Sequence, residues 1–203
     1  DSDTWMAVPF AGAPSRRLGF SAIWTGREMV GWGGFVPNGF YLAGGGAYNP
    51  LTGVWRALSS ENQPAPRNNH SAVWADGRMI VWGGFAADPG GVYDFSTNRW
   101  TRISTTNAPR SGYGAVWTGK EMFVSTGALY DPNSNTWRQA ARSEISVPGS
   151  LTSARWPLWT GKEVLIGGLR YDPLQDQWNK ISRINAPRLG EYSSAIWTGS
   201  EMV

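Results

Sequence analysis

The sequence contains no cysteine and only one histidine among its 203 residues. Without cysteine there is no disulfide framework, no thiol nucleophile and no cysteinyl metal site. A single histidine argues against a transition-metal centre with several nitrogen or sulfur ligands. No dense aspartate pattern indicates a calcium site. We therefore expect neither a metal nor a cofactor.

Long apolar runs and clusters of basic residues are also missing. No apolar stretch is long enough to span a bilayer, so no membrane span is expected. The formal net charge is +3 and the pI is about 9.4, but the arginines occur singly and make no track for nucleic acid. The chain opens without a charged and apolar leader, as the mature part of a secreted protein also would. Localisation therefore stays open, with a secreted or cell-surface location favoured.

Glycine, proline and tryptophan are abundant, with 26, 13 and 13 residues. Turn-forming residues combined with large aromatic side chains favour many short strands over long helices. Hydrophobic residues make up 41% of the chain, which is enough for a packed core. The composition predicts an all-β fold.

One phrase occurs five times along the chain. It reads SAIWTGREMVGWGG from Ser21, SAVWADGRMIVWGG from Ser71, GAVWTGKEMFVSTG from Gly114, PLWTGKEVLIGG from Pro157 and SAIWTGSEMV from Ser194. The tryptophan of this phrase recurs after 50, 43, 42 and 38 residues. A period of this size is typical of a repeat architecture.

The phrase predicts two strands joined by a tight turn, which we name strands A and B of each repeat. Gly26-Arg27 fits a type II′ hairpin turn, and Asp76-Gly77 fits type I′. Strand B ends in glycines such as Gly33-Gly34, where a missing Cβ permits positive φ or close backbone approach.

Strand C then leads into a turn, and a tryptophan opens strand D. The four turns read YNPLTGVW, YDFSTNRW, YDPNSNTW and YDPLQDQW. Asp or Asn at the turn start can accept backbone N–H bonds, and the following proline presets φ. Each repeat is therefore predicted as a four-stranded antiparallel meander. Such a unit cannot bury both faces alone, so the units must stack.

The glycine doublet, the Tyr-Asp-Pro turn and the spaced tryptophans resemble the kelch repeat, found in bacterial-type kelch and galactose oxidase-like propeller domains. The resemblance covers residues 1–203 as a single domain and implies a β-propeller of four-stranded antiparallel blades. Complete blades are expected at about 21–60, 71–105, 114–142 and 156–183. Two positions depart from the pattern: Ser125-Thr126-Gly127 replaces a doublet, and Asn49 stands where other repeats have Asp.

Partial blades are expected over 1–10 and 193–203, with a strand D over Thr4–Val8 and a strand B that stops unfinished. These ends favour part of a ring of six or seven blades. A partner chain that completes the ring is the alternative, and open blade edges would also permit self-association.

The connections between strands B and C vary most in length. They span 35–47 and 85–92 in the first two repeats but only 128–129 and 169–170 in the last two. In kelch proteins these loops share one face with the D-to-A loops and commonly form the ligand surface, so the resemblance places binding there. The predicted ligand-binding residues are Arg17, Phe35, Tyr41, Arg67, Asn69, His70, Arg110, Tyr113, Arg155, Arg188 and Tyr192. The long loops add Asn38, Phe40, Phe85 and Asp88.

Several of these patterns also have a structural interpretation. The repeated tryptophans are expected in the core, and the Tyr-Asp turn is expected to be structural. The repeated arginines either bind a ligand or bond loop carbonyls. His70 is expected to be a packing residue and not a catalytic base, and Arg155 stands at a shifted spacing.

Three functions remain open. The favoured one is a non-catalytic binding or scaffold module for a protein partner, because no dedicated nucleophile is evident and the rim is asymmetric. The second is a carbohydrate-binding propeller, favoured by the aromatic content, although packing explains most of the tryptophans. The arginines among aromatics and amides on the binding face would suit an acidic peptide or a carboxylated sugar. The third is a metal-independent sugar epimerase or mutarotase-like enzyme, with Glu191 near Arg188 and Tyr192 for proton transfer. Copper oxidase chemistry is not expected, because the ligands that galactose oxidase uses are missing.

Overall fold

The computed structural model describes residues 4–85, 89–110, 114–141, 156–182, 184 and 195–203. These residues form strands and no helix, arranged as four separate 4-stranded sheets. Neighbouring strands are antiparallel and follow chain order within every sheet. The prediction of an all-β chain built from four-stranded meanders is confirmed.

The first sheet contains β1 (Ser21–Trp24), β2 (Met29–Trp32), β3 (Gly45–Asn49) and β4 (Val54–Ala57). The second contains β5 (Ser71–Ala75), β6 (Arg78–Trp82), β7 (Gly91–Asp94) and β8 (Arg99–Arg102). The third contains β9 (Ala115–Trp117), β10 (Met122–Val124), β11 (Ala128–Asp131) and β12 (Thr136–Gln139). The fourth contains β13 (Leu158–Trp159), β14 (Val164–Ile166), β15 (Leu169–Asp172) and β16 (Gln177–Lys180).

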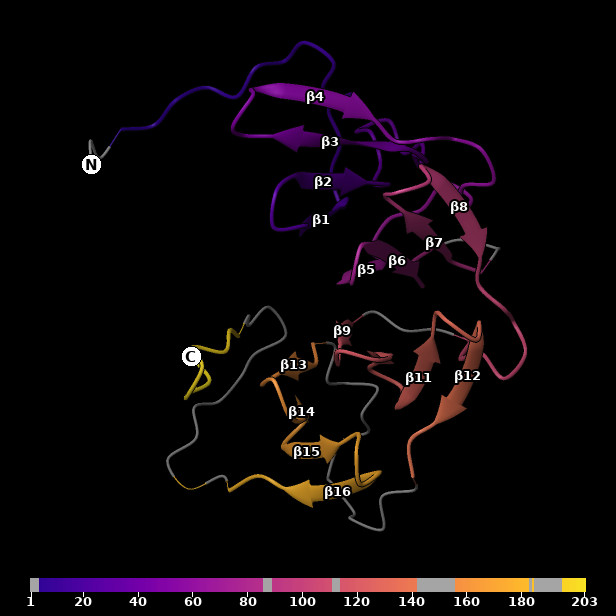
Figure 1. Cartoon of the computed structure of the whole chain (residues 1–203), viewed down its shortest axis with the longest axis vertical. Helices are drawn as coiled ribbons and strands as arrows, with labels where there is room; N and C mark the ends of the chain where they lie inside the picture. Colours follow the sequence, from indigo (N-terminus) through magenta and orange to yellow (C-terminus); the bar gives the residue numbers. More distant parts are fainter. Residues whose placement is uncertain (1–3, 86–88, 111–113, 142–155, 183, 185–194) are drawn as a thin grey trace.

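The four sheets follow one another around a common centre (Figure 1). The first strand of each sheet lies toward this centre, and the last strand lies at the outside. The inner strands of consecutive sheets contact one another, β1 with β5, β5 with β9 and β9 with β13. The arrangement is propeller-like.

The hairpin turns between the first two strands have the predicted backbone. Gly26 has a φ of 90°, while Asp76 and Gly77 have φ values of 48° and 89°. A type II′ turn requires positive φ at its first central residue, and a type I′ turn requires it at both. The Thr25 hydroxyl also accepts a hydrogen bond from the Glu28 N–H at 2.9 Å, which closes the first of these turns.

The turns between the third and fourth strands are held by the predicted Asn or Asp. The side-chain oxygen of each accepts the backbone N–H two residues ahead, at 2.8 or 2.9 Å. The four residues are Asn49, Asp94, Asp131 and Asp172. In the first, second and fourth sheets the same oxygen also accepts the backbone N–H three residues ahead, so one side chain caps two donors of the turn.

The ends of the chain depart from the predicted strands. Residues 4–10 form no strand, so the strand expected over Thr4–Val8 is wrong, and no strand of the described part lies beside it to supply ladder bonds. Pro9 nevertheless accepts a hydrogen bond from Trp55 Nε1 at 2.9 Å. Of the last repeat, residues 195–203 form a single antiparallel bridge between Trp197 and Met202.

The hydrophobic core of the described residues lies between consecutive sheets. One cluster joins Val30, Trp32, Ala47 and Leu58 of the first sheet to Met79, Val81, Tyr93 and Trp100 of the second. Two equivalent clusters join the second sheet to the third and the third to the fourth. Trp100 and Trp137 are buried in these clusters, as expected for core residues. The same expectation is wrong for Trp5 and Trp24, which are 100% and 53% exposed.

A repeated pair of hydrogen bonds, which we name the inter-sheet latch, joins each sheet to the one before it. Trp100 Nε1 donates to the Ser59 carbonyl at 2.9 Å, and Asn98 Oδ1 accepts from the Ser59 N–H at 3.3 Å. The later latches use Trp137 and Asn135 on Ser104, and Trp178 and Asp176 on Ala141, with every distance 2.9 Å. Both backbone groups of one residue in the preceding sheet are thus satisfied by the next sheet.

The Asn or Asp of the latch is positioned by its backbone and by a tyrosine. Asn98, Asn135 and Asp176 have φ values of 56°, 55° and 52°, a region that Asn and Asp tolerate better than most residues. The hydroxyls of Tyr93, Tyr130 and Tyr171 donate to the same side-chain oxygens. The Tyr, the Asn or Asp and the Trp of the repeated turn therefore act as one unit.

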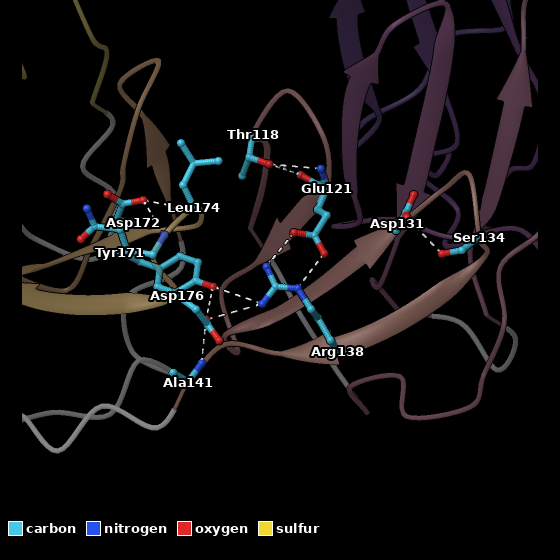
Figure 2. A network of polar contacts seen from close by, with 11 residues as sticks. Thr118, Glu121, Asp131, Ser134, Arg138, Ala141, Tyr171, Asp172, Leu174 and Asp176 are labelled. Atoms are coloured by element: carbon cyan, nitrogen blue, oxygen red, sulfur yellow. Dashed lines mark hydrogen bonds and ion pairs between the residues drawn. The ribbon is translucent and has the colours of Figure 1, made fainter.

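The latch between the third and fourth sheets extends into an ionic network (Figure 2). Arg138 forms a bidentate pair with Glu121, with both N–O distances 2.7 Å, and its third nitrogen donates to the Tyr171 hydroxyl at 3.3 Å. Hydrogen bonding to Glu121 raises the pKa of Arg138. Burial opposes ionisation of Asp176, but hydrogen bonds from Tyr171, Ala141 and Arg138 outweigh it and lower the pKa of this carboxyl.

In the first sheet only one of the two latch hydrogen bonds forms, because both the donor and the acceptor of the other are missing. Trp55 makes its bond to the Pro9 carbonyl, but Gly53 stands two residues earlier and has no side chain to accept a second one. Pro9 has no N–H to donate. The missing donor and the missing acceptor match, so the absent bond leaves no backbone N–H of residue 9 unpaired.

We expect Asn135→Gly to lower the free energy of unfolding by about 2 kcal/mol, measured by urea denaturation. Glycine keeps the positive φ but leaves the Ser104 N–H and the Tyr130 hydroxyl without their acceptor. Asn62→Gly is the matched control, because Asn62 also has positive φ but makes no side-chain hydrogen bond within the described residues. It should change stability by less than about 0.5 kcal/mol. Equal losses in the two variants would contradict the latch.

Candidate functional site

The antiparallel meanders sort their connections onto two faces. Turns between the first and second strands, and between the third and fourth, lie at one end of every sheet. We name the other end the loop face; it carries the connections from second to third strand and those between consecutive sheets. The first two sheets have long loops here, over 33–44 and 83–90, whereas the third and fourth have tight turns over 125–127 and 167–168.

The loop of the first sheet is folded back on itself by backbone hydrogen bonds. Leu18 and Phe35 exchange two bonds of 2.8 Å, and Phe35 forms a second bridge with Tyr41. At the tip, the Gly39 N–H donates to the Val36 carbonyl at 2.8 Å. These bonds give a defined backbone to a segment that lies outside the main sheets.

Two of the predicted arginines clamp the long loops. Arg17 donates to the carbonyls of Gly33 and Gly44, both at 3.0 Å, which lie at the two ends of the first loop. Arg67 does the same in the second sheet, donating to Gly83 at 3.0 Å and to Pro89 at 3.1 Å. Arg67 is only 1% exposed. Both guanidinium groups are thus committed to loop carbonyls, as one of the two sequence interpretations expected.

The glycine doublets allow the next inter-sheet connection to cross the loop closely. Gly34 has a φ of 96°, and its N–H donates to the Arg67 carbonyl at 2.8 Å. A Cβ on Gly34 would lie 2.6 Å from the Leu18 carbonyl oxygen, and one on Gly84 would lie 2.4 Å from the Asn68 carbonyl oxygen. Any side chain at either glycine would therefore displace the backbone of the loop face.

Arg110 occupies the same place in the repeat but has no loop to clamp. The following turn of the third sheet is closed by Gly127 donating to the Val124 carbonyl at 2.8 Å. Arg110 is exposed and forms no hydrogen bond or ion pair in the part of the chain that the structure describes. Loop length thus decides whether an arginine of this series is structural.

His70 is a buried residue between the first and second sheets. Its Nε2 lies 2.7 Å from Ser21 Oγ, and its ring packs edge-on against Trp32 with the centroids 5.2 Å apart. Its Nδ1 is buried without a partner. Burial first, and the nearby Arg67 charge second, lower the pKa of His70 to about 4. The imidazole is neutral near pH 7 and contacts no carboxylate in the described residues, which fits the packing role expected of it.

The remaining predicted residues divide into two groups. Asn69 and Tyr41 are exposed on the loop face, where Asn69 has a φ of 51° and Phe35 is half-buried. Tyr113, Arg155, Arg188 and Tyr192 lie outside the described residues, as do Asp88 and Glu191. Ligand binding by the predicted set stays a prediction.

Five exposed apolar side chains lie on loop-face segments that backbone hydrogen bonds and bridges join to one another. Leu18, Phe20, Phe40, Tyr41 and Phe85 each leave between 46% and 69% of their surface exposed. Neither Leu18 nor Phe20 was among the sequence candidates. The run Leu18 to Phe20 directly after a clamping arginine was the signal that could have identified them. We name these five residues the aromatic rim.

Metal-ligand groups and membrane-spanning helices are both absent from the described part of the chain. No three His, Cys, Asp or Glu side chains there are grouped so that they could hold a metal ion. Nor does that part contain a helix long and apolar enough to cross a membrane.

We expect the stability contributed by His70 to be lost as the pH falls from about 6.5 to about 4. Above this window the histidine is neutral in both states; within it the unfolded chain takes up a proton that the folded chain resists. The free energy of unfolding should therefore fall by about 3 kcal/mol across the window. Urea denaturation of wild type and H70F at several pH values isolates this component, because phenylalanine does not titrate. Parallel pH profiles would contradict it.

Arg67→Met should lower the free energy of unfolding by about 3 kcal/mol, because it leaves the buried carbonyls of the clamp without donors. Arg110→Met is the matched control at the equivalent repeat position and should change stability by less than about 0.5 kcal/mol. Thermal and urea denaturation of both variants measure this. A similar effect of the two substitutions would mean that the clamp contributes nothing.

No protein-family model matches the chain, and no curated protein matches its sequence.

Proposed function

We propose that the chain is a non-catalytic binding module of the kelch-type β-propeller class. It recognises a protein partner through the loop face of its first two sheets. The aromatic rim supplies the contact surface, and the arginine clamps hold it in shape.

The observation that carries this proposal is the exposure of the aromatic rim on fixed loops. Large apolar side chains grouped on a surface mark interaction sites more often than scattered ones do. Aromatic side chains, including Phe and Tyr, are also enriched in the buried centre of protein interfaces. Because the Arg17 and Arg67 clamps hold the ends of these loops beforehand, less ordering entropy is lost on binding.

The commitment of the arginines favours a protein over a small anionic ligand. Arg17 and Arg67 were two of the five arginine candidates for binding a carboxylate, and both donate to loop carbonyls. A carbohydrate remains the alternative ligand, because exposed Phe and Tyr rings can also stack on sugar rings. The core tryptophans Trp100 and Trp137 cannot contact a sugar, since they are buried between sheets.

An enzymatic role has weaker support. Ser21 and His70 are paired at 2.7 Å, but a catalytic pair also needs a group that orients the histidine. His70 Nδ1 has no such partner. Its lowered pKa also makes it a weak base near neutral pH.

The kelch-type assignment is supported by the roles that the repeated residues have. The glycine doublets pass beneath the next connection, and the Tyr, Asn or Asp and Trp of the repeated turn form the latch. Each of these contacts involves residues of the repeated sequence pattern, and each joins one repeat to the next.

The binding proposal is tested by selecting a random peptide library displayed on phage against the immobilised chain. Selected peptides should bind the wild type and lose about 100-fold in affinity for F40S/Y41S/F85S, measured by calorimetry. Leu51→Ser with Leu174→Ser is the matched control, because these leucines are 88% and 89% exposed on turns of the opposite face. The control should bind within about 2-fold of wild type, and all variants should keep their melting temperature.

Two results would count against the proposal. Selection that yields no peptide would reject protein binding, and binding to a glycan array in that case would favour the carbohydrate alternative. Peptides that bind F40S/Y41S/F85S as tightly as wild type would place the contact surface elsewhere.

A further inference from the structure

The long loop of the first sheet ends in a small hairpin of its own. A bridge between Phe35 and Tyr41 joins its two arms. The turn over residues 37–39 is closed by the Gly39 N–H, which donates to the Val36 carbonyl at 2.8 Å. Gly39 has a φ of 90°, the left-handed conformation that follows a type I turn in hairpin loops of this length. The turn therefore needs a glycine at this position, directly after an asparagine.

Asn38 and Gly39 form the one Asn-Gly pair of the sequence, and both are exposed. The backbone nitrogen that follows an asparagine can attack the side-chain amide carbon and close a succinimide ring. Glycine permits this attack best, because it has no Cβ to hinder the nitrogen and its backbone is the most mobile. Asn62 and Asn107 are also exposed, but each precedes a residue that carries a Cβ. The hairpin thus holds the asparagine of this chain that is most open to ring closure.

We propose that Asn38 is a site of spontaneous deamidation in the folded chain. The Gly39 nitrogen loses its proton to solvent base and bonds to Asn38 Cγ. The bond between Cγ and Nδ2 then breaks, and ammonia leaves with a proton taken from water. A second water opens the succinimide at either carbonyl. Opening at Cγ gives aspartate, and opening at the backbone carbonyl gives isoaspartate, in which the main chain runs through Cβ and Cγ.

The fold slows this reaction without preventing it. The Gly39 N–H is held by the Val36 carbonyl, so the nitrogen must leave this bond before it can attack. The bond lies at an exposed tip, and such segments open locally at a small cost in free energy. The Arg17 clamp holds the two ends of the loop and not this tip. We therefore expect Asn38 to react more slowly in the folded chain than in the unfolded chain.

Both products change the loop face. The new carboxylate is charged near neutral pH, and it lies two residues before Phe40 of the aromatic rim. Isoaspartate also lengthens the main chain of the turn, which then no longer fits the bridge between Phe35 and Tyr41. A charge brought into an apolar contact must lose its water, so partner binding should weaken. This effect on binding rests on the proposed function, whereas the modification itself does not.

The modification is tested by ageing the whole chain at physiological temperature and mapping its peptides by mass spectrometry. The peptide with Asn38 should gain the mass difference between an amide and an acid, and part of it should become a substrate of isoaspartyl methyltransferase. The rate should rise with pH, because the attacking nitrogen must lose its proton. Asn62 and Asn107 in the same digest are matched controls and should stay intact. Asn38→Gln should abolish the change, because glutamine would have to close a larger ring.

The same chain in urea calibrates the timescale and should react about 10-fold faster at Asn38 than the folded chain. An Asn38 that stays intact in the folded chain for about 100 half-times of the reaction in urea would overturn the proposal. Conversion of Asn62 or Asn107 at the same rate as Asn38 would also overturn it, because the hairpin would then have no special role.

Peptides selected on the fresh chain measure the effect on binding. They should bind aged wild type about 10-fold more weakly than fresh wild type, whereas Asn38→Gln should keep its affinity on ageing. Conversion of Asn38 without any change in affinity would overturn the effect on the loop face. A selection that yields no peptide would reject the proposed function alone, since the mass change is measured without a partner.

Discussion

The structure depends on the contact between one sheet and the next. A single four-stranded meander has two apolar faces and cannot bury both, so its stability comes from its neighbours. The described core clusters all lie between sheets, and the latch adds direction to this packing. The next sheet binds both backbone groups of Ser59, Ser104 or Ala141. These bonds fix how far it can slide along the preceding sheet as well as its distance from that sheet.

The packing of the sheets also positions the connections of the loop face. The connection that crosses from one sheet to the next also closes over the preceding glycine doublet, and its arginine clamps the next loop. Hydrogen bonds to backbone carbonyls therefore hold the loops on the sheets, and side chains such as Phe40 and Phe85 stay exposed. Arg17 and Arg67 are used in this framework, and binding through the exposed side chains is the function that we propose.

The sequence predicted what local chemistry determines. The repeated phrase, the turn types and the role of Asn49, Asp94, Asp131 and Asp172 follow from short-range rules, and the structure agrees with them. The arginines were ambiguous because their role depends on a distant loop: Arg67 is committed and Arg110 is not, according to the length of the loop that follows. The contact between Ser21 and His70 spans two sheets, and Thr4–Val8 lacks a neighbouring strand. No local pattern contains that information.

Exchange of the tryptophan indole protons, followed by NMR in deuterated water, tests the latch most directly. Trp100, Trp137 and Trp178 each donate an indole N–H to a carbonyl of the preceding sheet, whereas Trp5 is 100% exposed. If the sheets are latched, the indole protons of Trp100 and Trp137, which are also buried, should exchange at least about 100-fold more slowly than that of Trp5. Exchange at the rate of Trp5 would mean that the sheets are not held together by the latch, and it would contradict the account of how the loop face is positioned.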